Sequence, residues 1–262
     1  MRIALGIEYD GRGFCGWQTQ PGGGGIQDSL EAALTQIADQ PISTICAGRT
    51  DAGVHASGQV VHFDCKAERP LTAWTRGVNA LLPEGVAVIW ASPVAESFHA
   101  RFSAVAREYR YVLLNGPVRP ALEHGRVGWC HSPLDLAAMQ TAAGCLQGTH
   151  DFSAFRSAEC QARSPVRTLE RLRIVREGGY VLFDFRANAF LHHMVRNLVG
   201  SLVHVGKGAQ PPSWLKNVLD SGDRTQADRT FEAAGLYLTR VEYPDFALPP
   251  GRSACRDGRP SG

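Results

Sequence analysis

Strand-like and helix-like hydrophobic patterns alternate along the first hundred residues. Apolar side chains occupy every second position from Ile3 to Tyr9, which predicts a strand. A glycine-rich loop at 10–25 follows, and the helical spacing of apolar residues from Ile26 to Ile37 then predicts a helix. The same patterns predict a strand at 59–64, a short helix at 72–82 and a further strand at 86–90.

The second half of the chain repeats this alternation. A strand is predicted over Tyr109–Leu114, and Ser132–Pro133 is a typical start for a helix that continues through Leu146. Two strand patterns, Leu169–Val175 and Tyr180–Ala187, are separated by a glycine pair and predict a hairpin. A strongly amphipathic helix is predicted over Leu191–Val205. The last predicted elements are a short helix opened by Pro211–Pro212 and a strand over Leu236–Val241.

This order of elements predicts an α+β protein with two similar halves that meet near residue 105. We expect an N-terminal domain over 1–105 and a C-terminal domain over 106–244, which together form a mostly antiparallel central sheet flanked by helices. The segment 245–262 has almost no apolar periodicity and several Pro and Arg residues, so we expect a mostly disordered tail.

Composition indicates an ordinary globular chain, because 44% of the 262 residues are hydrophobic and 20% are charged. The net charge of +2 does not mark a nucleic-acid binder, yet all but three of the 27 basic residues are Arg. Two alternative interpretations of this excess are genomic base composition and selection for bidentate phosphate contacts, and composition does not decide between them. Locally, six Arg and two Glu give 156–176 a charge of +4, and Arg101, Arg107 and Arg110 form a second basic cluster.

The cysteines and the N-terminus bear on the cellular compartment. Seven cysteines without a CxxC pair disfavour a disulfide framework and fit a reducing compartment. The chain reaches an acidic residue at Glu8, too early for a signal-peptide core, and no apolar run approaches the roughly 18 residues of a membrane-spanning helix. We therefore expect a cytoplasmic protein.

The segment with the clearest chemical signal is GRTDAGVHA at 48–56. Asp51 lies on a predicted loop, and nearly extended backbone there would put the Arg49 guanidinium on the same side as the Asp51 carboxylate. At roughly 4 Å such a pair is worth about 1–4 kcal/mol and keeps the carboxylate ionised, which suits a nucleophile. A turn Asp that caps its own backbone is the alternative interpretation.

This segment resembles the signature of the tRNA pseudouridine synthase A family, in which the Asp is the catalytic nucleophile. The resemblance extends along nearly the whole chain, as far as about Pro244. The other matching segments, in chain order, are YDG and FCGWQ within 9–18, FHARFS at 98–103, REYRY at 107–111, DFSAFR at 151–156, FLHHMVRN at 190–197 and GLYL at 235–238.

The resemblance implies a pseudouridine synthase fold with a basic cleft between the halves, and a reaction without metal or organic cofactor. Asp51 would attack either the ribose C1′ or the uracil C6. Tyr109 matches the aromatic residue that stacks on the target base, and Arg196 matches the Arg that pairs with the catalytic Asp. Arg49 matches the Arg that contacts RNA and helps to displace the base, and Leu236 matches the apolar residue under the uracil.

The implied substrate is the anticodon stem-loop of many tRNAs, at positions 38, 39 and 40, and the implied assembly is a homodimer in which one tRNA touches both subunits. Core roles are the alternative interpretation for Leu236 and for the two tyrosines Tyr109 and Tyr111, which point to the same face of a strand.

Other classes of function fit parts of the sequence. A non-catalytic RNA-binding module would use the basic clusters but has no reason to keep Asp51 near phosphates, and a glycosidase needs a second acid near the motif. Adjacent helical residues diverge by about 100°, which disfavours a metal site at His192–His193. The glycines at 22–25 resemble a phosphate-binding loop only weakly, since no Lys-Ser/Thr pair follows them.

Overall fold

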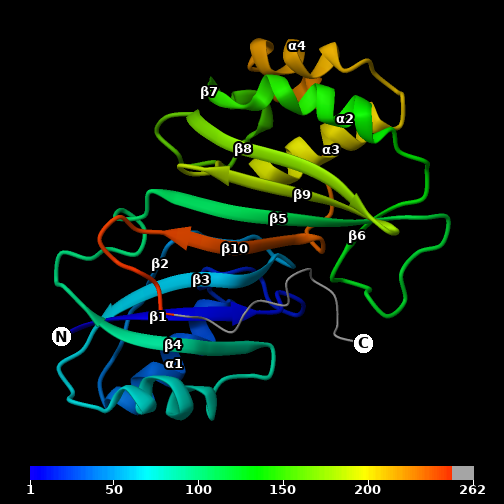
Figure 1. The fold of residues 1–262 in the computed structure, drawn as a ribbon. Coiled ribbons are helices and arrows are strands. Elements are labelled where there is room, and N and C mark those ends of the chain that lie inside the picture. The colour runs from blue at the N-terminus through cyan, green and yellow to red at the C-terminus, as the bar shows by residue number, and fades with distance from the viewer. Residues whose placement is uncertain (250–262) are drawn as a thin grey trace. The chain divides into compact units, whose positions relative to one another are not determined.

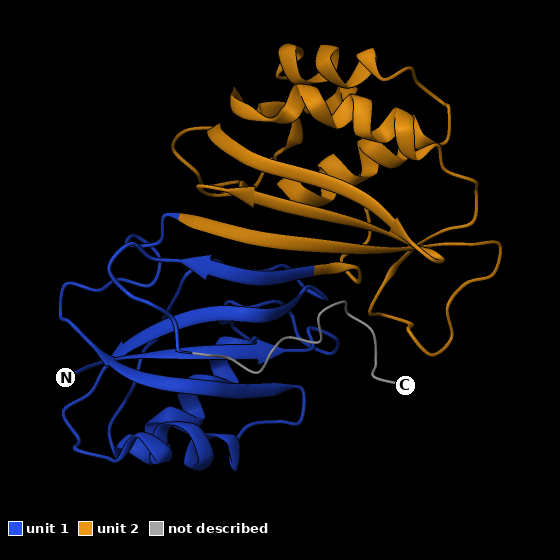
Figure 2. Cartoon of the chain, in the orientation of Figure 1, with its two compact units in different colours: residues 1–105, 237–262 blue, residues 106–236 orange. Residues whose placement is uncertain are grey.

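The computed structural model describes residues 1–249 (Figure 1). The chain divides into two compact units, which are residues 1–105 with 237–262 (unit 1) and residues 106–236 (unit 2; Figure 2). Unit 2 ends at Leu236 rather than at 244, because strand β10 (Leu236–Glu242) pairs in parallel with β3 (His55–Asp64) of unit 1 through Tyr237 and Leu238.

The sheet of unit 1 is built around β1 (Arg2–Tyr9). This strand lies between β3 and β4 (Val86–Val94) and is antiparallel to both, while the short β2 (Ile45–Cys46) also pairs with β3. The predicted strand at 3–9 is confirmed, but it is buried on both faces. A Cβ atom at Gly6 would lie 2.1 Å from the Trp90 indole nitrogen, so the glycine lets that ring cover this face.

Helix α1 (Ile26–Ala38) begins directly after the glycine-rich loop and buries Ile26, Leu30 and Leu34, as its apolar spacing predicts. The Asp28 carboxylate accepts a hydrogen bond from the Gly25 backbone N–H at 2.9 Å, which stabilises the start of the helix. The short predicted helix at 72–82 contains one π-helical turn, η1 (Ala73–Gly77).

The described residues include only the first part of the predicted tail at 245–262. Residues 250–262 lie outside them, so the expected disorder there stays a prediction. Before that limit, the Phe246 ring packs against Phe98 and Trp90, with ring centroids 5.3 and 6.1 Å away. The sequence pattern did not predict this contact.

The sheet of unit 2 has the order β5 (Ala106–Asn115), β9 (Tyr180–Ala187), β8 (Val166–Glu177) and β7 (Gly148–Asp151), with antiparallel neighbours. The short β6 (Gly128–Cys130) pairs in parallel with β5. The predicted hairpin is confirmed as β8–β9, and its turn contains Gly178 at a φ of 57°. Sheets in both units are thus mostly antiparallel.

The helices of unit 2 gather on one face of its sheet (Figure 1). They are α2 (Leu136–Ala143), α3 (Met194–Gly206) and α4 (Ser213–Ser221), with 3-10 turns η2 (Gly144–Leu146), η3 (Ser153–Phe155) and η4 (Arg224–Gln226). The predicted α+β class is confirmed. No helix formed by residues 1–249 has the length and apolar composition of a membrane-crossing segment.

Two predicted helix starts are wrong, each for a local reason. Helix α2 begins at Leu136 rather than at Pro133, because the Asp135 carboxylate accepts a hydrogen bond from the Ala138 backbone N–H at 2.9 Å and caps the helix there. Helix α3 begins at Met194 rather than at Leu191, because His193 has a left-handed backbone with a φ of 63°.

Candidate active site

Asp51 lies in unit 1 on the loop that joins β2 to β3. The backbone N–H of Val54 donates a hydrogen bond to the Asp51 carbonyl at 3.1 Å, and Gly53 has a φ of 77° in the tight turn between them. The Asp51 side chain is half-buried and that of Arg49 is exposed. Among the described residues no ion pair joins Arg49 to Asp51, so the pairing expected from their spacing is not formed, and the exposed guanidinium faces solvent.

The FCGWQ segment holds the loop from one side. The Trp17 backbone N–H donates to the Thr50 carbonyl at 3.0 Å, and the Trp17 carbonyl accepts from Gln27 at the start of α1 at 2.9 Å. Gly16 has a φ of 92°, and a Cβ atom there would lie only 2.8 Å from the Thr50 carbonyl oxygen. Gly16 is therefore required both by its left-handed backbone and by the close approach of the loop.

The YDG segment holds the other end of the loop. The buried His55 ring accepts a hydrogen bond at Nδ1 from the Gly11 backbone N–H at 3.0 Å and stacks on Tyr237, with ring centroids 4.6 Å apart. A Cβ atom at Gly11 would lie 2.1 Å from the Val54 carbonyl oxygen, so only glycine allows this approach. Sequence reasoning recognised this motif but assigned it no part in supporting Asp51.

Asp10 contributes a fixed negative charge beside this end of the loop. Its Oδ1 lies 3.3 Å from His55 Nδ1, and its carboxylate accepts hydrogen bonds from the Arg12 side chain at 2.6–3.0 Å. Burial alone would raise the pKa of Asp10, but the hydrogen bonds from Arg12 and the nearby positive charge outweigh it and lower the pKa to about 2. Asp10 is therefore ionised at any pH near neutrality.

Tyr109 lies on β5 of unit 2, opposite Phe185 on β9. The Tyr109 side chain is 9% exposed, and its ring meets Phe190 edge to face at a centroid distance of 5.0 Å. Tyr111, two residues further on, is fully buried and donates its hydroxyl hydrogen bond to the Glu232 carbonyl at 2.9 Å, as expected of a core aromatic residue.

Arg196 lies in the first turn of α3 and is half-buried. Its Nε donates a hydrogen bond to the Phe231 carbonyl at 2.9 Å, and the Phe231 backbone N–H donates to the Arg196 carbonyl at 3.2 Å. Leu236, at the first position of β10, is buried. Its burial is consistent with packing under the uracil and equally with a role in the core. Within unit 2, the helix and the segment before β10 therefore fix Arg196 together.

Asn197 is a supporting residue of α3 that sequence reasoning missed. It is fully buried, and its side-chain amide donates to the Phe155 carbonyl at 2.8 Å. Its Oδ1 accepts hydrogen bonds from Arg224 Nη2 at 3.1 Å and from Thr230 Oγ1 at 2.7 Å. Asn197 thus joins the DFSAFR and FLHHMVRN segments, and its only signal in the sequence is a polar residue on the apolar side of the helix.

His192 and His193 precede α3 instead of lying within it. Because His193 adopts a left-handed backbone, the two rings lie side by side with centroids 4.1 Å apart. The argument that helical geometry separates the two imidazoles is therefore wrong. The expectation that no metal is required then rests on the family resemblance.

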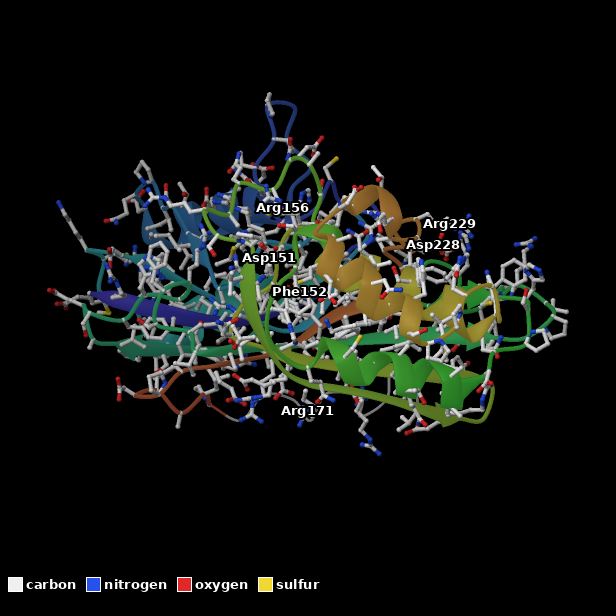
Figure 3. All side chains as sticks on the ribbon, turned by 90° about the horizontal axis from the view of Figure 1, so that it is seen from above. Asp151, Phe152, Arg156, Arg171, Asp228 and Arg229 are labelled. Carbon is white, nitrogen blue, oxygen red and sulfur yellow. The ribbon has the colours of Figure 1, made fainter. Side chains whose placement is uncertain are left out.

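The two basic clusters of the sequence are not continuous basic surfaces. Arg107 is buried and donates to the Asn188 carbonyl at 2.9 Å, while Arg110 pairs with Asp184 at 2.7 Å. In the other cluster, Arg171 pairs with Glu108 at 3.4 Å. Figure 3 shows Arg156 and Arg171 on opposite sides of unit 2, so these two residues of the segment do not share one basic face.

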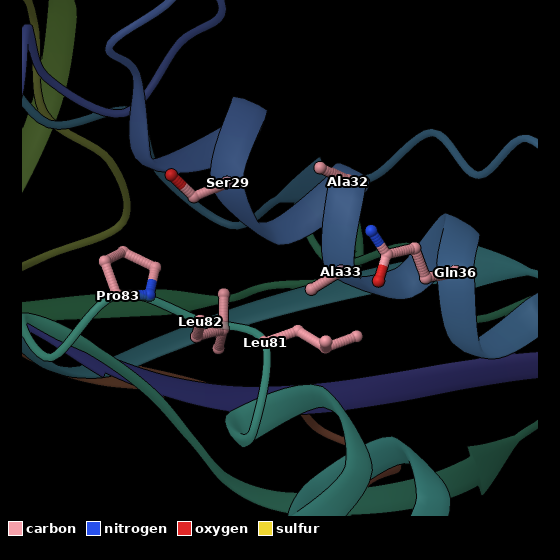
Figure 4. Close-up of a pocket in the computed structure, with 7 residues that line it drawn as sticks. All are labelled: Ser29, Ala32, Ala33, Gln36, Leu81, Leu82 and Pro83. Atoms are coloured by element: carbon pink, nitrogen blue, oxygen red, sulfur yellow. The ribbon is translucent and has the colours of Figure 1, made fainter.

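A groove of about 400 Å³ in unit 1 has none of the predicted site residues in its lining (Figure 4). It is lined by side chains of α1 between Ser29 and Gln36 and by residues 81–83. Its lining contains no acid, base or thiol, so the groove itself offers no catalytic group.

Comparisons with known proteins agree over nearly the whole chain. A sequence profile of the family described as tRNA pseudouridine synthase matches residues 6–103 and 142–244, which include Arg49, Asp51, Arg196 and Leu236, whereas Tyr109 lies between the two stretches. The chain is 63% identical over 250 residues to tRNA pseudouridine synthase A of Thiobacillus denitrificans, covering 95% of this chain and 96% of that one. Identity is 60% to the proteins of the same name from Dechloromonas aromatica, with 98% and 99% coverage, and from Chromobacterium violaceum, with 98% of both.

One solved structure, the crystal structure of a Cbf5–Nop10–Gar1 complex, covers 90% of this chain and 48% of that one, with a TM-score of 0.39 and 14% identity. A likeness this low bears on neither the site nor the function.

Proposed function

We propose that this chain, which belongs to the tRNA pseudouridine synthase family, converts uridine to pseudouridine at positions 38, 39 and 40 of the tRNA anticodon stem-loop. The family fixes the reaction, which is the isomerisation of a uridine in tRNA. The target positions are supported by the full-length similarity to proteins named tRNA pseudouridine synthase A and by the motifs that match this family in order along the chain.

Asp51 is the nucleophile in this proposal. Its carboxylate forms a covalent bond to the ribose C1′ or to the uracil C6, and the N1–C1′ bond breaks. The base then turns, its C5 bonds to C1′, and the covalent bond to Asp51 breaks, which regenerates the carboxylate. The proton on C5 is removed and N1 gains a proton, so that substrate and product have the same composition. The observation that carries the assignment is the Asp51 loop, where backbone contacts to Trp17 and Val54 hold a half-buried carboxylate in one place.

The other site residues act on the target base and on the carboxylate. Tyr109 stacks on the base, which is worth about 1–3 kcal/mol and offsets part of the few kcal/mol that extruding a nucleotide costs. In this proposal its hydroxyl assists removal of the proton on C5. Arg196 pairs with Asp51, Arg49 contacts the RNA and helps to displace the base, and Leu236 packs under the uracil. The edge-to-face contact of Tyr109 with Phe190 supports a fixed ring orientation.

The family resemblance supports three further proposals. The protein acts in the cytoplasm, it is a homodimer in which one tRNA contacts both subunits, and it needs neither a metal ion nor an organic cofactor.

The test is to map pseudouridine in total tRNA from cells that lack the protein and from cells complemented with wild type, Asp51→Asn or Asp39→Asn. Asp39 is an exposed carboxylate of the same unit with a φ of 53°, a conformation that Asn tolerates, so Asp39→Asn is the matched control. We expect wild type and Asp39→Asn to restore pseudouridine at positions 38–40. We expect Asp51→Asn to bind tRNA but to form no pseudouridine.

Two outcomes would contradict the proposal at separate points. Turnover by Asp51→Asn would remove the nucleophile assignment. Unchanged pseudouridine at all three positions in cells that lack the protein would remove the assignment of the target positions.

A further inference from the structure

Three buried polar side chains lie beside the Asp51 loop and take no part in the chemistry proposed above. They are Tyr9 on β1, Thr50 in the loop and Gln59 on β3, with exposed fractions of 4%, 7% and 0%. A buried polar group is unfavourable unless it is hydrogen-bonded, and apolar side chains of similar size would fill the same space. The hydrogen bonds among these three side chains therefore indicate a role in holding the Asp51 loop.

Gln59 forms two hydrogen bonds with the backbone at the start of the loop. Its Nε2 donates a hydrogen bond to the Gly48 carbonyl at 2.6 Å, and its Oε1 accepts one from the Gly48 backbone N–H at 3.4 Å. The same Nε2 lies 3.3 Å from the Tyr9 hydroxyl, which in turn lies 2.8 Å from Thr50 Oγ1. One amide thus connects the Gly48 backbone to the residue immediately before Asp51.

The chemistry of the amide sets the direction of the bond between Gln59 and Tyr9. The amide nitrogen of Gln59 only donates, so the Tyr9 oxygen accepts from it. In the bond between the Tyr9 hydroxyl and Thr50 Oγ1, either oxygen can donate the proton. Since the Thr50 carbonyl is held by the Trp17 backbone N–H at 3.0 Å, Thr50 is fixed through its side chain and through its backbone at once. The peptide group that joins Thr50 to Asp51 is therefore held in one orientation.

We propose that Tyr9 and Gln59 are positioning residues for the reaction of Asp51 and act through Thr50. The inference rests on the proposed role of Asp51 as nucleophile. All three side chains are uncharged, so they influence the reaction through the orientation of the Asp51 carboxylate and not through its charge. A displacement of about 1 Å at a reacting group costs on the order of 100-fold in rate, which makes a small rotation of this peptide consequential.

The first test removes one oxygen atom from the network. Tyr9→Phe keeps the ring that packs on Trp17 at a centroid distance of 5.8 Å but loses the hydroxyl. We expect kcat to fall about 10- to 100-fold, while KM and the Kd for tRNA stay within about twofold. The matched control is Tyr243→Phe, which removes another buried hydroxyl of unit 1, one that donates to the Ala100 carbonyl at 2.7 Å. We expect wild-type kcat from the control, and an equal loss in both variants would overturn the proposal.

The second test changes Thr50 and stays informative if Tyr9→Phe does not fold. Thr50→Ser keeps the hydroxyl and is expected to retain kcat within about threefold, whereas the isosteric Thr50→Val is expected to lose as much as Tyr9→Phe. The double variant Tyr9→Phe/Thr50→Val should be no worse than the poorer single variant, because both remove the same hydrogen bond. Independent losses that multiply in the double variant would contradict a shared path to Asp51.

Asp51→Asn, measured in the same assay, separates this inference from the proposal on which it rests. If Asp51→Asn is active, the nucleophile assignment fails, and the positioning role fails with it. If Asp51→Asn is inactive while Tyr9→Phe and Thr50→Val keep wild-type kcat, only the positioning role is wrong.

Discussion

The two units hold their candidate site residues in different ways. In unit 1, Asp51 lies on an irregular loop that is fixed by uncharged hydrogen bonds from distant parts of the chain, such as the Tyr9 hydroxyl 41 positions before Thr50. In unit 2, Arg196 lies in a regular helix, and its neighbour Asn197 binds a carbonyl group, a hydroxyl group and the charged Arg224. The first arrangement fixes a single peptide group, and the second fixes the packing of a whole helix.

This difference separates the expected effects of mutations in the two places. A loop held by a few contacts can shift while the core stays folded, so damage around Asp51 lowers activity before it lowers stability. Helix α3 buries most of its residues, so an unpaired polar group beside Arg196 destabilises the core itself. The predictions that follow test this contrast.

The largest effect is expected from Asn197→Ala in unit 2. The substitution leaves the Phe155 carbonyl, Thr230 and the charged Arg224 without their buried partner, and we expect a loss of about 3–5 kcal/mol in the free energy of unfolding. Urea unfolding measures it. The control, Asn79→Ala, removes two hydrogen bonds from an exposed side chain to the Val88 backbone, none of them to a charged group, and should cost about 1 kcal/mol. Equal losses would mean that burial of Asn197 is not the cause.

The same contrast explains what the sequence could predict. Regular elements with a strong apolar period, such as β1, α1 and the β8–β9 hairpin, were predicted close to their observed bounds. The start of α3 was not, because a left-handed backbone at His193 leaves no pattern in the sequence. The parallel pairing of β10 with β3 was missed for the same reason, since nothing near Leu236 indicates its partner strand.

The candidate site could also be predicted only in part. The motif around Asp51 could be recognised because its residues are consecutive, whereas the contacts that support it could not. The Tyr9–Thr50 and Tyr9–Gln59 bonds join residues 41 and 50 positions apart, and no local spacing encodes them. The roles of Tyr109, Arg196, Arg49 and Leu236 stay predictions from the family motifs.

The next largest effect is the response of unit 1 to acid. The buried His62 accepts a hydrogen bond at Nδ1 from the Ala100 backbone N–H at 3.1 Å. Burial, together with the positive charge of Arg2, lowers the pKa of His62 from 6.5 to about 4. Between these values the unfolded chain binds more protons than the folded one. Stability is therefore complete above about pH 6.5 and falls as the pH drops towards 4, by about 2–3 kcal/mol.

This acid response should distinguish the two units. The stabilisation from Asp10, whose pKa is lowered from 3.8 to about 2, is complete above pH 3.8 and does not change in this window. Hydrogen exchange of peptides from each unit should show unit 1 losing protection first as the pH falls from 6.5 to 4.5. His62→Gln should flatten this dependence, and an unchanged slope in that variant would assign it to another group.

A smaller effect on stability is expected where the loop approaches Gly16. Gly16→Ala places a Cβ atom 2.8 Å from the Thr50 carbonyl oxygen at a φ of 92°, and should cost about 1–2 kcal/mol and lower kcat about tenfold. Gly23→Ala is the matched control, because Gly23 has a φ of 74° with nothing within 4 Å of the added atom. Both variants carry the backbone strain, and only Gly16→Ala should lose kcat. A similar kcat loss in Gly23→Ala would show that strain alone, without contact to Thr50, disturbs the site.

The smallest effect is expected from an arginine of unit 2 that is already paired. Arg110 binds Asp184 at 2.7 Å, so Arg110→Gln should change the Kd for tRNA less than twofold and leave its salt dependence unaltered. The contrasting variant is Arg101→Gln in unit 1, where an exposed guanidinium lies over the Phe102 ring at 5.6 Å. It should reduce the slope of log Kd against log salt by about 1, the loss of one phosphate contact. If both variants weakened binding equally, pairing with Asp184 would not remove Arg110 from the RNA-binding surface, and the charge of the two units would have to be treated alike.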